Sequence, residues 1–527
     1  MDTGNEQRDP RGAAAANPAP VRSSIEHFDV VIVGAGLSGI CAAYHLQAKL
    51  PHKRFLILEA RDAIGGTWDL FRYPGVRSDS DMYTLGYRFR AWRDSRAIAD
   101  GALIREYIAD AAQAYGIRSK IRFRHRVAEA AWDSGSATWR LRAEVGAEGD
   151  TRIPVAFTCQ FLFMCSGYYD YRAGYLPDWP GMADYAGTLV HPQHWPADLN
   201  YRRKRVVVIG SGATAVTLVP AMAQQAAHVT MLQRSPTYMV SRPAEDRLAG
   251  WLYRRLPTGA AASVARWKNV LLGTAFFNIA RRKPGFTRRL IEKGVKRQLA
   301  AHYEARHFTP SYNPWEQRLC LVPDGDFFRA MRDGKASIVT DEIERFTPTG
   351  LLLRSGQRLE ADIIVTATGL RLQLFGGMKV SVDGVEKNVA ESLVYKGMMY
   401  SGIPNLASAF GYVNASWTLR CELTAEYVCR LLRHMERRQL HWCMPQRPTG
   451  SMPERPVLDL SSGYVRRGAD VLPRQGARQP WRAYQNYLRD RLAMRFSRIN
   501  DGTMRFGRAM PDTKAAQPVD PAPLTAT

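Results

Sequence analysis

The chain has 527 residues, of which 73 are Lys or Arg and 49 are Asp or Glu, so its formal net charge is +24 at pH 7. A chain of this length exceeds what one hydrophobic core supports, so we expect several domains. No apolar run reaches the roughly 18 to 20 residues that cross a bilayer, which argues against a transmembrane protein. The seven scattered cysteines contain no C-x-x-C pair, so a reduced, cytoplasmic protein is expected.

The chain begins with a segment that is rich in Ala, Pro and Arg. It lacks the apolar centre of a signal peptide, so we expect a disordered leader over residues 1–27. A similar composition predicts a disordered tail over residues 511–527.

The first ordered unit predicted, FDVVIVGAGLSGICAAYHL, is an apolar strand, a turn and a helix. Gly34, Gly36 and Gly39 form a G-x-G-x-x-G turn, which lets the backbone and the helix N-terminus approach a pyrophosphate. A second strand, FLILEA, ends in Glu59, 25 residues beyond Gly34. This acid is placed to accept hydrogen bonds from ribose hydroxyls, so the unit is a predicted dinucleotide site.

Residues 61–89 form a predicted loop that is crowded with Gly, aromatic and charged side chains. In its RSDSD stretch, Asp81 is expected to be the acid that caps the loop. The segment FLFMCSGYY is a later buried strand that ends in Ser-Gly, and YAGTLVHPQHWP follows it. His191 and His194 have an H-x-x-H spacing, but no Cys or carboxylate cluster accompanies them, so no metal site is predicted.

A second unit, RVVVIGSGATAVTLVPAM, repeats the strand–turn–helix pattern with Gly210, Gly212 and Ala215. Its second strand, HVTMLQRSP, ends in Arg234 and Ser235 in place of an acid. An acid there would repel a 2′-phosphate, whereas an arginine and a hydroxyl bind one. The first site is therefore predicted to hold an adenine dinucleotide with a free ribose, and the second NADPH.

Residues 251–300 contain 12 Lys or Arg and one acid, with the apolar centre WKNVLLGTAFFNIARRKPGF. A helical insert with a solvated basic face is the favoured interpretation. Contact with the surface of a membrane is the alternative. No nucleic-acid partner is expected, because no helix-turn-helix, zinc-finger or RNP-like motif accompanies the charge.

The motifs GAGLSG, GGTW, YAGTLVHPQHWP, GSGATA and a late TATG together resemble those of class B flavoprotein monooxygenases. The Y-x-G-x-x-x-H-x-x-x-W spacing is similar to the Baeyer–Villiger monooxygenase fingerprint, with Tyr185 in place of the commoner Phe. The stretches GTWDLFRYPGVRSDSDMYTLGYRFR, RSPTY and YNPWEQRLCLVP look closest to the ethionamide-activating branch. The resemblance covers about residues 28–506.

The resemblance implies an α/β fold with two Rossmann-like dinucleotide-binding domains, one for FAD and one for NADP, a helical insertion and a C-terminal extension. The expected boundaries are an FAD domain over 28–180 and 346–430, an NADP domain over 181–345 with a basic helical insert over 243–305, and an extension over 431–510.

The activity implied is an FAD- and NADPH-dependent oxygenation, in which one oxygen of O₂ enters next to a ketone carbonyl to give an ester or lactone. Members of the resembled branch also transfer oxygen to the sulfur of sulfides and thioamides. The alternative is an N- or S-oxygenating flavin monooxygenase. A flavin disulfide reductase is disfavoured, because the nearest cysteines, Cys159 and Cys165, lie along a predicted buried strand. A binding protein with relic nucleotide folds is the non-enzymatic alternative.

Residue roles are carried over at matching positions. The resemblance implies FAD contacts at Gly34, Gly36, Ser38, Gly39, Glu59, Thr67, Trp68, Asp69, Leu70, Asp79 and the backbone of Val127. It implies NADP contacts at Arg77, Ser78, Asp79, His191, Gly210, Ser211, Gly212, Ala213, Thr214, Ala215, Val216, Arg234 and Ser235. The implied catalytic pair is Arg318, oriented by Asp79. Many relatives place Lys immediately before this arginine, and Gln317 stands there in this chain.

Overall fold

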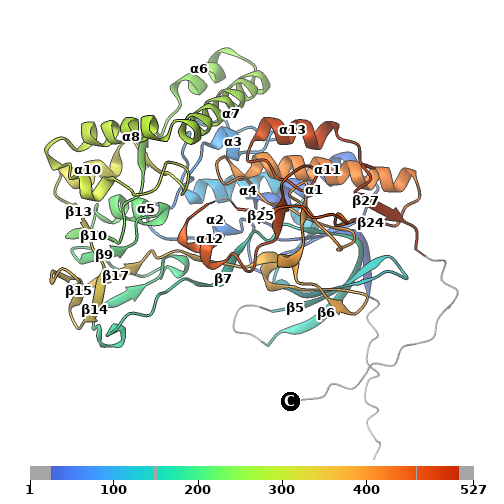
Figure 1. Cartoon of the computed structure of the whole chain (residues 1–527), viewed down its shortest axis with the longest axis horizontal. Helices are drawn as coiled ribbons and strands as arrows, with labels where there is room; N and C mark the ends of the chain where they lie inside the picture. The colour runs from blue at the N-terminus through green and yellow to red at the C-terminus, as the bar shows by residue number, and fades with distance from the viewer. Residues whose placement is uncertain (1–24, 147–150, 459, 510–527) are drawn as a thin grey trace, which may run out of the picture.

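The computed structural model describes residues 25–146, 151–458 and 460–509. The predicted leader up to residue 24 and the predicted tail lie outside this range, and the last leader residues already belong to a strand that begins at Glu26. Figure 1 shows two sheet-containing lobes, with a group of helices along the upper edge of the molecule. No helix in the described part of the chain is long and apolar enough to cross a membrane.

The first lobe is built on β1 (Glu26–Val33), which lies between β2 (Phe55–Leu58) and β6 (Ile153–Met164) in parallel register. Strand β2 and the last four residues of β1 and of β6 are buried, because α1 (Leu37–Lys49) and other elements cover the sheet, which explains the apolar sequence of these parts. The other strands of this 11-stranded sheet are β3 (Ile121–Arg122), β4 (His125–Asp133), β5 (Thr138–Val145), β19 (Lys379–Val382), β20 (Val385–Glu386), β21 (Val394–Tyr395), β22 (Met399–Tyr400) and β23 (Leu406–Ser408).

The second lobe contains a five-stranded parallel sheet in the order β13-β10-β9-β17-β8. Its helix α5 (Ala213–Met222) follows the second glycine turn, and α10 (Asp326–Arg332) packs against α5. The strands are β8 (Thr188–Val190), β9 (Arg205–Ile209), β10 (His228–Gln233), β13 (Ala336–Thr340) and β17 (Ile363–Thr366).

The expected boundary between residues 345 and 346 is wrong. Strand β17 was expected in the returning FAD domain, but it lies between β9 and β8 of the second sheet. The antiparallel strands β14 (Ile343–Thr347), β15 (Gly350–Leu353) and β16 (Arg358–Glu360) precede it. An apolar strand does not encode which sheet it joins, because its partners are distant in sequence. The second domain therefore extends to about residue 368.

The chain crosses between the lobes twice, at neighbouring strands. Strand β7 (Tyr169–Gly174) leads into the second domain, and β18 (Leu370–Leu372) leads out of it. The two strands pair antiparallel, with Leu370 opposite Gly174. The two domains are therefore joined by a single two-stranded ribbon, made of β7 and β18.

The helical insertion consists of α6 (Arg247–Arg255), α7 (Thr258–Arg282) and α8 (Pro284–Leu299), which lie along the upper edge in Figure 1. A buried ion pair anchors α7, because Arg266 Nη2 lies 2.8 Å from Glu422 Oε2. Lys268 of α7 also pairs with Asp246, the residue that caps α6. The insert is thus fixed to the rest of the molecule by specific contacts.

The last part of the chain folds back over the first domain. Helix α11 (Trp417–Arg437) packs against α1 on one side and against α13 (Tyr487–Phe496) on another. The buried pair of Arg420 Nη1 and Asp490 Oδ2, 3.2 Å apart, joins α11 to α13. The remaining elements here are β24 (Trp442–Pro445), β25 (Glu454–Pro456), α12 (Gly463–Arg467), β26 (Arg474–Gly476) and β27 (Met504–Gly507).

Candidate active site

Two glycines of the first turn, Gly34 and Gly39, lie where a side chain would clash with the backbone. Gly34 has φ +106°, and a Cβ there would lie 2.7 Å from the carbonyl oxygen of Cys165. A Cβ at Gly39 would lie 1.9 Å from the oxygen of Gly34. Helix α1 begins after Gly36, and no side chain caps its first N–H groups. Uncapped N–H groups at a helix start bind anions, so this turn fits a pyrophosphate.

Glu59 lies buried just after β2. One carboxylate oxygen accepts from Ala35 N at 2.6 Å, and the other accepts from Arg61 N at 2.9 Å. Burial raises the pKa of Glu59, and the two backbone donors oppose that rise. Each oxygen keeps a further lone pair, so the carboxylate is positioned to accept from a ribose hydroxyl.

Ser38 was expected to contact FAD, but its side chain points to α11. Trp417 Nε1 donates to Ser38 Oγ at 2.8 Å, and Cys421 Sγ lies 3.2 Å from the same oxygen. The backbone N–H of Ser38, in the first turn of α1, is the group left for a phosphate. Sequence reasoning missed Trp417, because no local motif marks a residue that contacts a turn 379 positions away.

The residues after the Gly-Gly pair form a short helix, α2 (Thr67–Leu70). Thr67 Oγ1 lies 3.1 Å from the hydroxyl of Tyr171. The buried carboxylate of Asp69 is held by Arg61 at 2.8 Å and by Arg72 at 2.5 Å. Asp69 is therefore already engaged within the protein. Trp68 packs at the edge of the main core, and Leu70 and Val127 are buried.

The second glycine turn is tight on one side and open on the other. Gly210 has φ +137°, and a Cβ there would lie 2.3 Å from the oxygen of Ala367. A Cβ at Gly212 would meet nothing within 4 Å, and no side chain caps α5, which begins after it. The turn therefore leaves space for a phosphate beside free N–H groups. The other predicted contacts in this turn and first helical turn are Ser211, Ala213, Thr214, Ala215 and Val216.

Arg234 and Ser235 follow β10 and are exposed. Arg234 makes no ion pair within the described part of the chain, so its guanidinium is available to a ligand. The neighbouring Gln233 differs, because its buried amide donates to the carbonyl oxygen of His307 at 3.0 Å. Arg234 is therefore the positively charged side chain at the end of β10 that can contact a ligand.

A second arginine, which no sequence motif indicates, lies near Arg234. Arg467 of α12 stacks on the ring of Tyr175, with its guanidinium carbon 3.4 Å from the ring centroid. Partial burial lowers the pKa of Arg467, Tyr175 opposes this fall, and the charge of Arg234 adds to it. Two cations thus approach the second nucleotide site from different parts of the chain.

His191 lies against the double crossing between the domains. A Cβ at Gly174 would lie 1.9 Å from the His191 ring, so only glycine fits there. The ring Nδ1 accepts from Gln193 N at 3.2 Å, and Nε2 lies 3.3 Å from the oxygen of Gly369. Burial lowers the pKa of His191. The contacts fit a neutral ring with its proton on Nε2.

The segment before α3 (Met82–Leu85) joins the two domains. Arg77 Nη1 lies 2.5 Å from Asp326 Oδ2 at the start of α10. Ser78 is buried, and its hydroxyl accepts from Ala99 N at 3.2 Å. Asp81 accepts from Thr84 N and caps α3, as expected.

Asp79 meets Arg318, which approaches from the second domain. Arg318 Nη1 donates to Asp79 Oδ2 at 2.7 Å, and Arg318 Nε donates to the oxygen of Val413 at 3.3 Å. The Asp79 carboxylate raises the pKa of Arg318 further above its ordinary value. The two side chains are 35% and 45% exposed, so both remain accessible to a ligand.

Aromatic rings line the same region. Tyr168 stacks on Phe410 at 5.0 Å and on Trp417 at 5.3 Å, measured between ring centroids. Burial raises the pKa of Tyr168 well above its ordinary value, so the hydroxyl stays neutral. Arg318 and Tyr168 are close enough to influence each other's pKa. The site therefore combines a permanent cation with a flat, uncharged aromatic wall.

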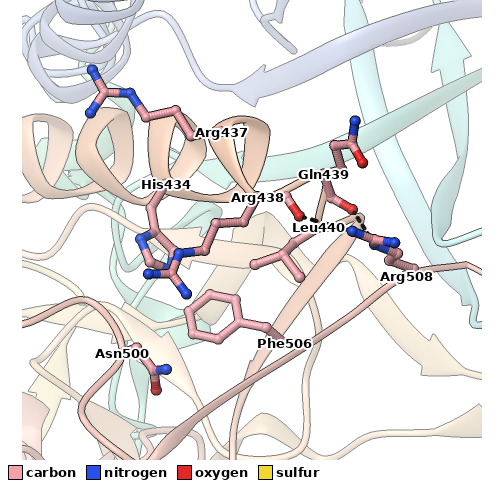
Figure 2. Close-up of a pocket in the computed structure, with 8 residues that line it drawn as sticks. All are labelled: His434, Arg437, Arg438, Gln439, Leu440, Asn500, Phe506 and Arg508. Carbon is pink, nitrogen blue, oxygen red and sulfur yellow. Dashed lines mark hydrogen bonds between the residues drawn. The ribbon is translucent and has the colours of Figure 1, made fainter.

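One cavity lies apart from this region. It has a volume of about 520 Å³ and is formed by the end of α11 and by β27. Figure 2 shows His434 and Arg438 beside Phe506, with Arg437 directed away. Arg508 Nε donates to the oxygen of Gln439 at 3.1 Å, so this arginine satisfies a carbonyl at the helix end. None of the predicted site residues lines this cavity.

Comparison with known proteins agrees with this arrangement. Residues 98–435 match the family described as flavin-binding monooxygenase-like, and residues 32–100 match an NAD(P)-binding Rossmann-like domain. The FAD-containing monooxygenase EthA of Mycobacterium tuberculosis is 53% identical over 485 residues, which is 92% of this chain and 98% of that protein. The putative FAD-containing monooxygenase MymA of the same organism is 49% identical over 496 residues, which is 93% of this chain and 100% of that protein.

Solved structures share the fold. An oxidized steroid monooxygenase bound to NADP has a TM-score of 0.70 at 20% identity, over 92% of this chain and 100% of that one. A complex of OTEMO with FAD and NADP has a TM-score of 0.65 at 22% identity, over 80% of this chain and 87% of that one. The chain therefore belongs to the flavin-binding monooxygenase-like family and is a class B flavoprotein monooxygenase, a class of enzyme that works with FAD and NADPH.

Proposed function

We propose that the protein is a Baeyer–Villiger monooxygenase that converts a ketone to an ester or lactone with O₂, FAD and NADPH. The pairing of Arg318 with Asp79 beside the aromatic wall is the observation that carries the proposal. The fingerprint around His191 supports it, because that loop lies on the connection between the two domains.

The two glycine turns fit two dinucleotides with different ribose contacts. FAD fits the first turn, where the start of α1 binds the pyrophosphate and Glu59 accepts from a ribose hydroxyl. NADPH fits the second turn, where the start of α5 binds the pyrophosphate and Arg234 and Ser235 bind the 2′-phosphate. Arg467 is placed to add a second cation near that phosphate. When bound, the flavin supplies the activated oxygen atom after NADPH has reduced it.

Arg318 provides what ketone oxygenation requires of the protein. Negative charge develops on the carbonyl oxygen as oxygen adds to the ketone, and a fixed guanidinium close to that oxygen stabilises it. Its pKa, already above about 12, is raised further by Asp79, so the side chain stays charged at any working pH. Asp79 fixes the direction of the guanidinium through one charge-assisted hydrogen bond.

The N- or S-oxygenating alternative has a different requirement. Oxygen transfer to an amine or a sulfide creates no carbonyl oxyanion, so it does not need a guanidinium at that place. Sulfides and thioamides are a second substrate class in this proposal. The uncharged aromatic wall can pack against them as it can against a ketone, because it forms no contact that depends on a carbonyl group.

The test is product identification with the purified, flavin-loaded protein, NADPH and a panel of ketones and sulfides. The proposal expects ester or lactone formation from at least one ketone, coupled to NADPH consumption. If sulfoxides or N-oxides form and no ketone in a chemically broad panel gives an ester, the alternative function replaces this one.

A further inference from the structure

The outer side of the helical insertion is unusually apolar. Of the 17 large apolar side chains that are exposed in the described part of the chain, nine lie within residues 248–290. These nine are Leu248, Trp251, Leu256, Val264, Leu271, Leu272, Ile279, Phe286 and Leu290. Concentrated exposure of this kind marks an interaction surface, whereas scattered single apolar residues do not.

The exposed residues follow helix geometry. On α7, Val264, Leu271 and Ile279 are seven and eight residues apart, so they lie on one side of the helix. The opposite side of α7 is buried, and Arg266 there donates to the oxygens of Gly86 and Tyr83 as well as to Glu422. The anchored side keeps α7 in place, so the bare side is a fixed surface.

Exposed cations lie on the same three helices and in the short segments between them. Arg254, Arg255, Arg282, Lys283, Arg289, Lys293 and Arg297 are exposed. None of the seven forms an ion pair with any residue that the structure describes. The one acid of residues 251–300, Glu292, pairs with Lys296 at 2.8 Å. We call the nine apolar and seven basic side chains together the apolar–basic face.

A cavity at this face has the same mixed chemistry. It has a volume of about 660 Å³ and lies between α7, α8 and β11 (Met239–Arg242). Phe276, Ile291 and Val295 are among its apolar lining residues. Its charged lining residues are Arg242, Arg297 and Asp324, whose carboxylate already accepts from Ala244 N at 3.0 Å. Because Leu290 and Arg297 belong both to the cavity and to the apolar–basic face, the cavity reaches that face.

We propose that the apolar–basic face docks the enzyme on the surface of an anionic lipid bilayer. The apolar stripe enters the boundary between headgroups and acyl chains, and the surrounding cations lie at the level of lipid phosphates. The cavity beside α8 accommodates part of one acyl chain, with Arg242 and Arg297 near its phosphate. This surface is separate from the nucleotide turns and from Arg318.

Charge decides between a bilayer and a second copy of the chain as the occupant. Residues 251–300 carry 11 more positive than negative charges, so two copies placed face to face would repel each other. An anionic bilayer offers both features that the face needs, an apolar interior and negative charge at its surface. On its other contacts, α7 meets the segment that leads to Arg318, because the ring of Phe277 lies edge-on to that of Trp315, with 5.4 Å between the ring centroids.

The test is co-sedimentation of the full-length, flavin-loaded protein with vesicles of phosphatidylcholine, alone or mixed with phosphatidylglycerol. We expect binding to the mixed vesicles at low salt and its loss at about 1 M salt, where the Debye length is ~3 Å. Two triple variants, L271S/L272S/I279S and R282E/K283E/R289E, should each weaken binding by about tenfold or more. The flavin content and the thermal midpoint show whether each variant is folded. If the triple apolar variant does not fold, the single variant L272S replaces it in the binding measurement.

Matched controls lie elsewhere on the surface. The variant I153S/V385S removes apolar side chains that are 63% and 59% exposed, and R345E/R358E reverses two exposed cations. Both controls should bind as the wild type does. The proposal is overturned if the wild type shows no preference for anionic vesicles or if both triple variants bind normally. It is also overturned if the wild type forms a dimer without lipid that L271S/L272S/I279S dissociates, since the face then belongs to a second copy.

Discussion

Arg318 Nη1 lies 2.7 Å from Asp79 Oδ2, although 239 positions separate the two residues in the chain. Asp79 comes from a segment of the first domain that also pairs with the second through Arg77 and Asp326. Arg318 comes from the second domain and contacts the oxygen of Val413 in the first. The pair therefore forms only when both domains are in place, and the predictions below depend on this arrangement.

Arg318→Ala should separate NADPH consumption from oxygenation. If the guanidinium stabilises charge that develops on the ketone oxygen, its loss should lower the rate of ester formation about 10² to 10³-fold. The variant should still bind flavin and oxidise NADPH, with hydrogen peroxide as the product. Arg318→Lys should rescue little, because a compact ammonium lacks the planar donor fork. The measurement is the amount of ester formed per NADPH consumed, with hydrogen peroxide measured in parallel. An ester yield in Arg318→Ala equal to that of the wild type would reject the assignment.

Asp79→Asn should reduce ester formation by about fivefold, the effect of roughly 1 kcal/mol lost from a partly exposed charge pair. Because Asp79 raises the pKa of Arg318, its removal lowers that pKa, but the ordinary value is already above about 12. Arg318 is charged below its pKa, so the variant should show no new pH dependence between about pH 6 and 9. A rate that titrates in this range in Asp79→Asn would contradict the assignment of Asp79 as the residue that orients Arg318.

Asp81→Asn provides the comparison for Asp79. Its carboxylate caps α3, so the substitution should change thermal stability and leave the ester yield per NADPH unaffected.

Arg234→Ala should weaken use of NADPH and leave use of NADH almost unchanged. A charge-assisted hydrogen bond to a phosphate contributes roughly 1.5 to 3 kcal/mol, so the KM for NADPH should rise about 10- to 100-fold. Arg467→Ala should act in the same direction with a smaller effect, and Gln317→Lys should lower the KM for NADPH. Steady-state kinetics with both cofactors checks all three variants. Equal losses with NADPH and NADH would show that Arg234 does not recognise the 2′-phosphate.

His45 should make the fold sensitive to acid. Burial lowers the pKa of this α1 residue to about 4, from an ordinary value near 6.5. Between these two pH values the unfolded chain binds a proton that the folded chain does not, so stability is lost as the pH falls below about 6.5. The loss is about 2 kcal/mol between pH 7 and 5. The thermal midpoint of His45→Leu should therefore fall less than that of the wild type over this range, and equal falls would contradict the assignment.

Local sequence patterns predicted the two nucleotide turns well. The spacing around Gly34 and Gly210 encodes a strand, a turn and a helix within about 20 residues, and the structure has these elements at both places. The resemblance to class B flavoprotein monooxygenases is confirmed. The partnership of Asp79 with Arg318 came from the family resemblance, because no spacing within the chain indicates a contact across 239 positions.

Features that depend on distant contacts were missed or wrong. Strand β17 was assigned to the wrong domain, because an apolar strand does not indicate its partners. The contact of the Ser38 hydroxyl with Trp417 was missed, because Trp417 lies on a helix near the other end of the chain. Arg467 gave no signal either, since an arginine in a polar segment is usually an exposed surface residue.

The pairing of β7 with β18 makes the second domain a removable module. Its entry and exit strands are hydrogen-bonded neighbours, so two cuts at adjacent positions would release the whole unit between them. Exchange of this unit between related enzymes therefore requires only two junctions in the main chain. Adjustments are also needed where side chains of the exchanged unit pair with the first domain, at Arg77–Asp326, Asp79–Arg318 and Arg266–Glu422. A chimera that keeps these three ion pairs should carry over its donor's choice of nicotinamide cofactor.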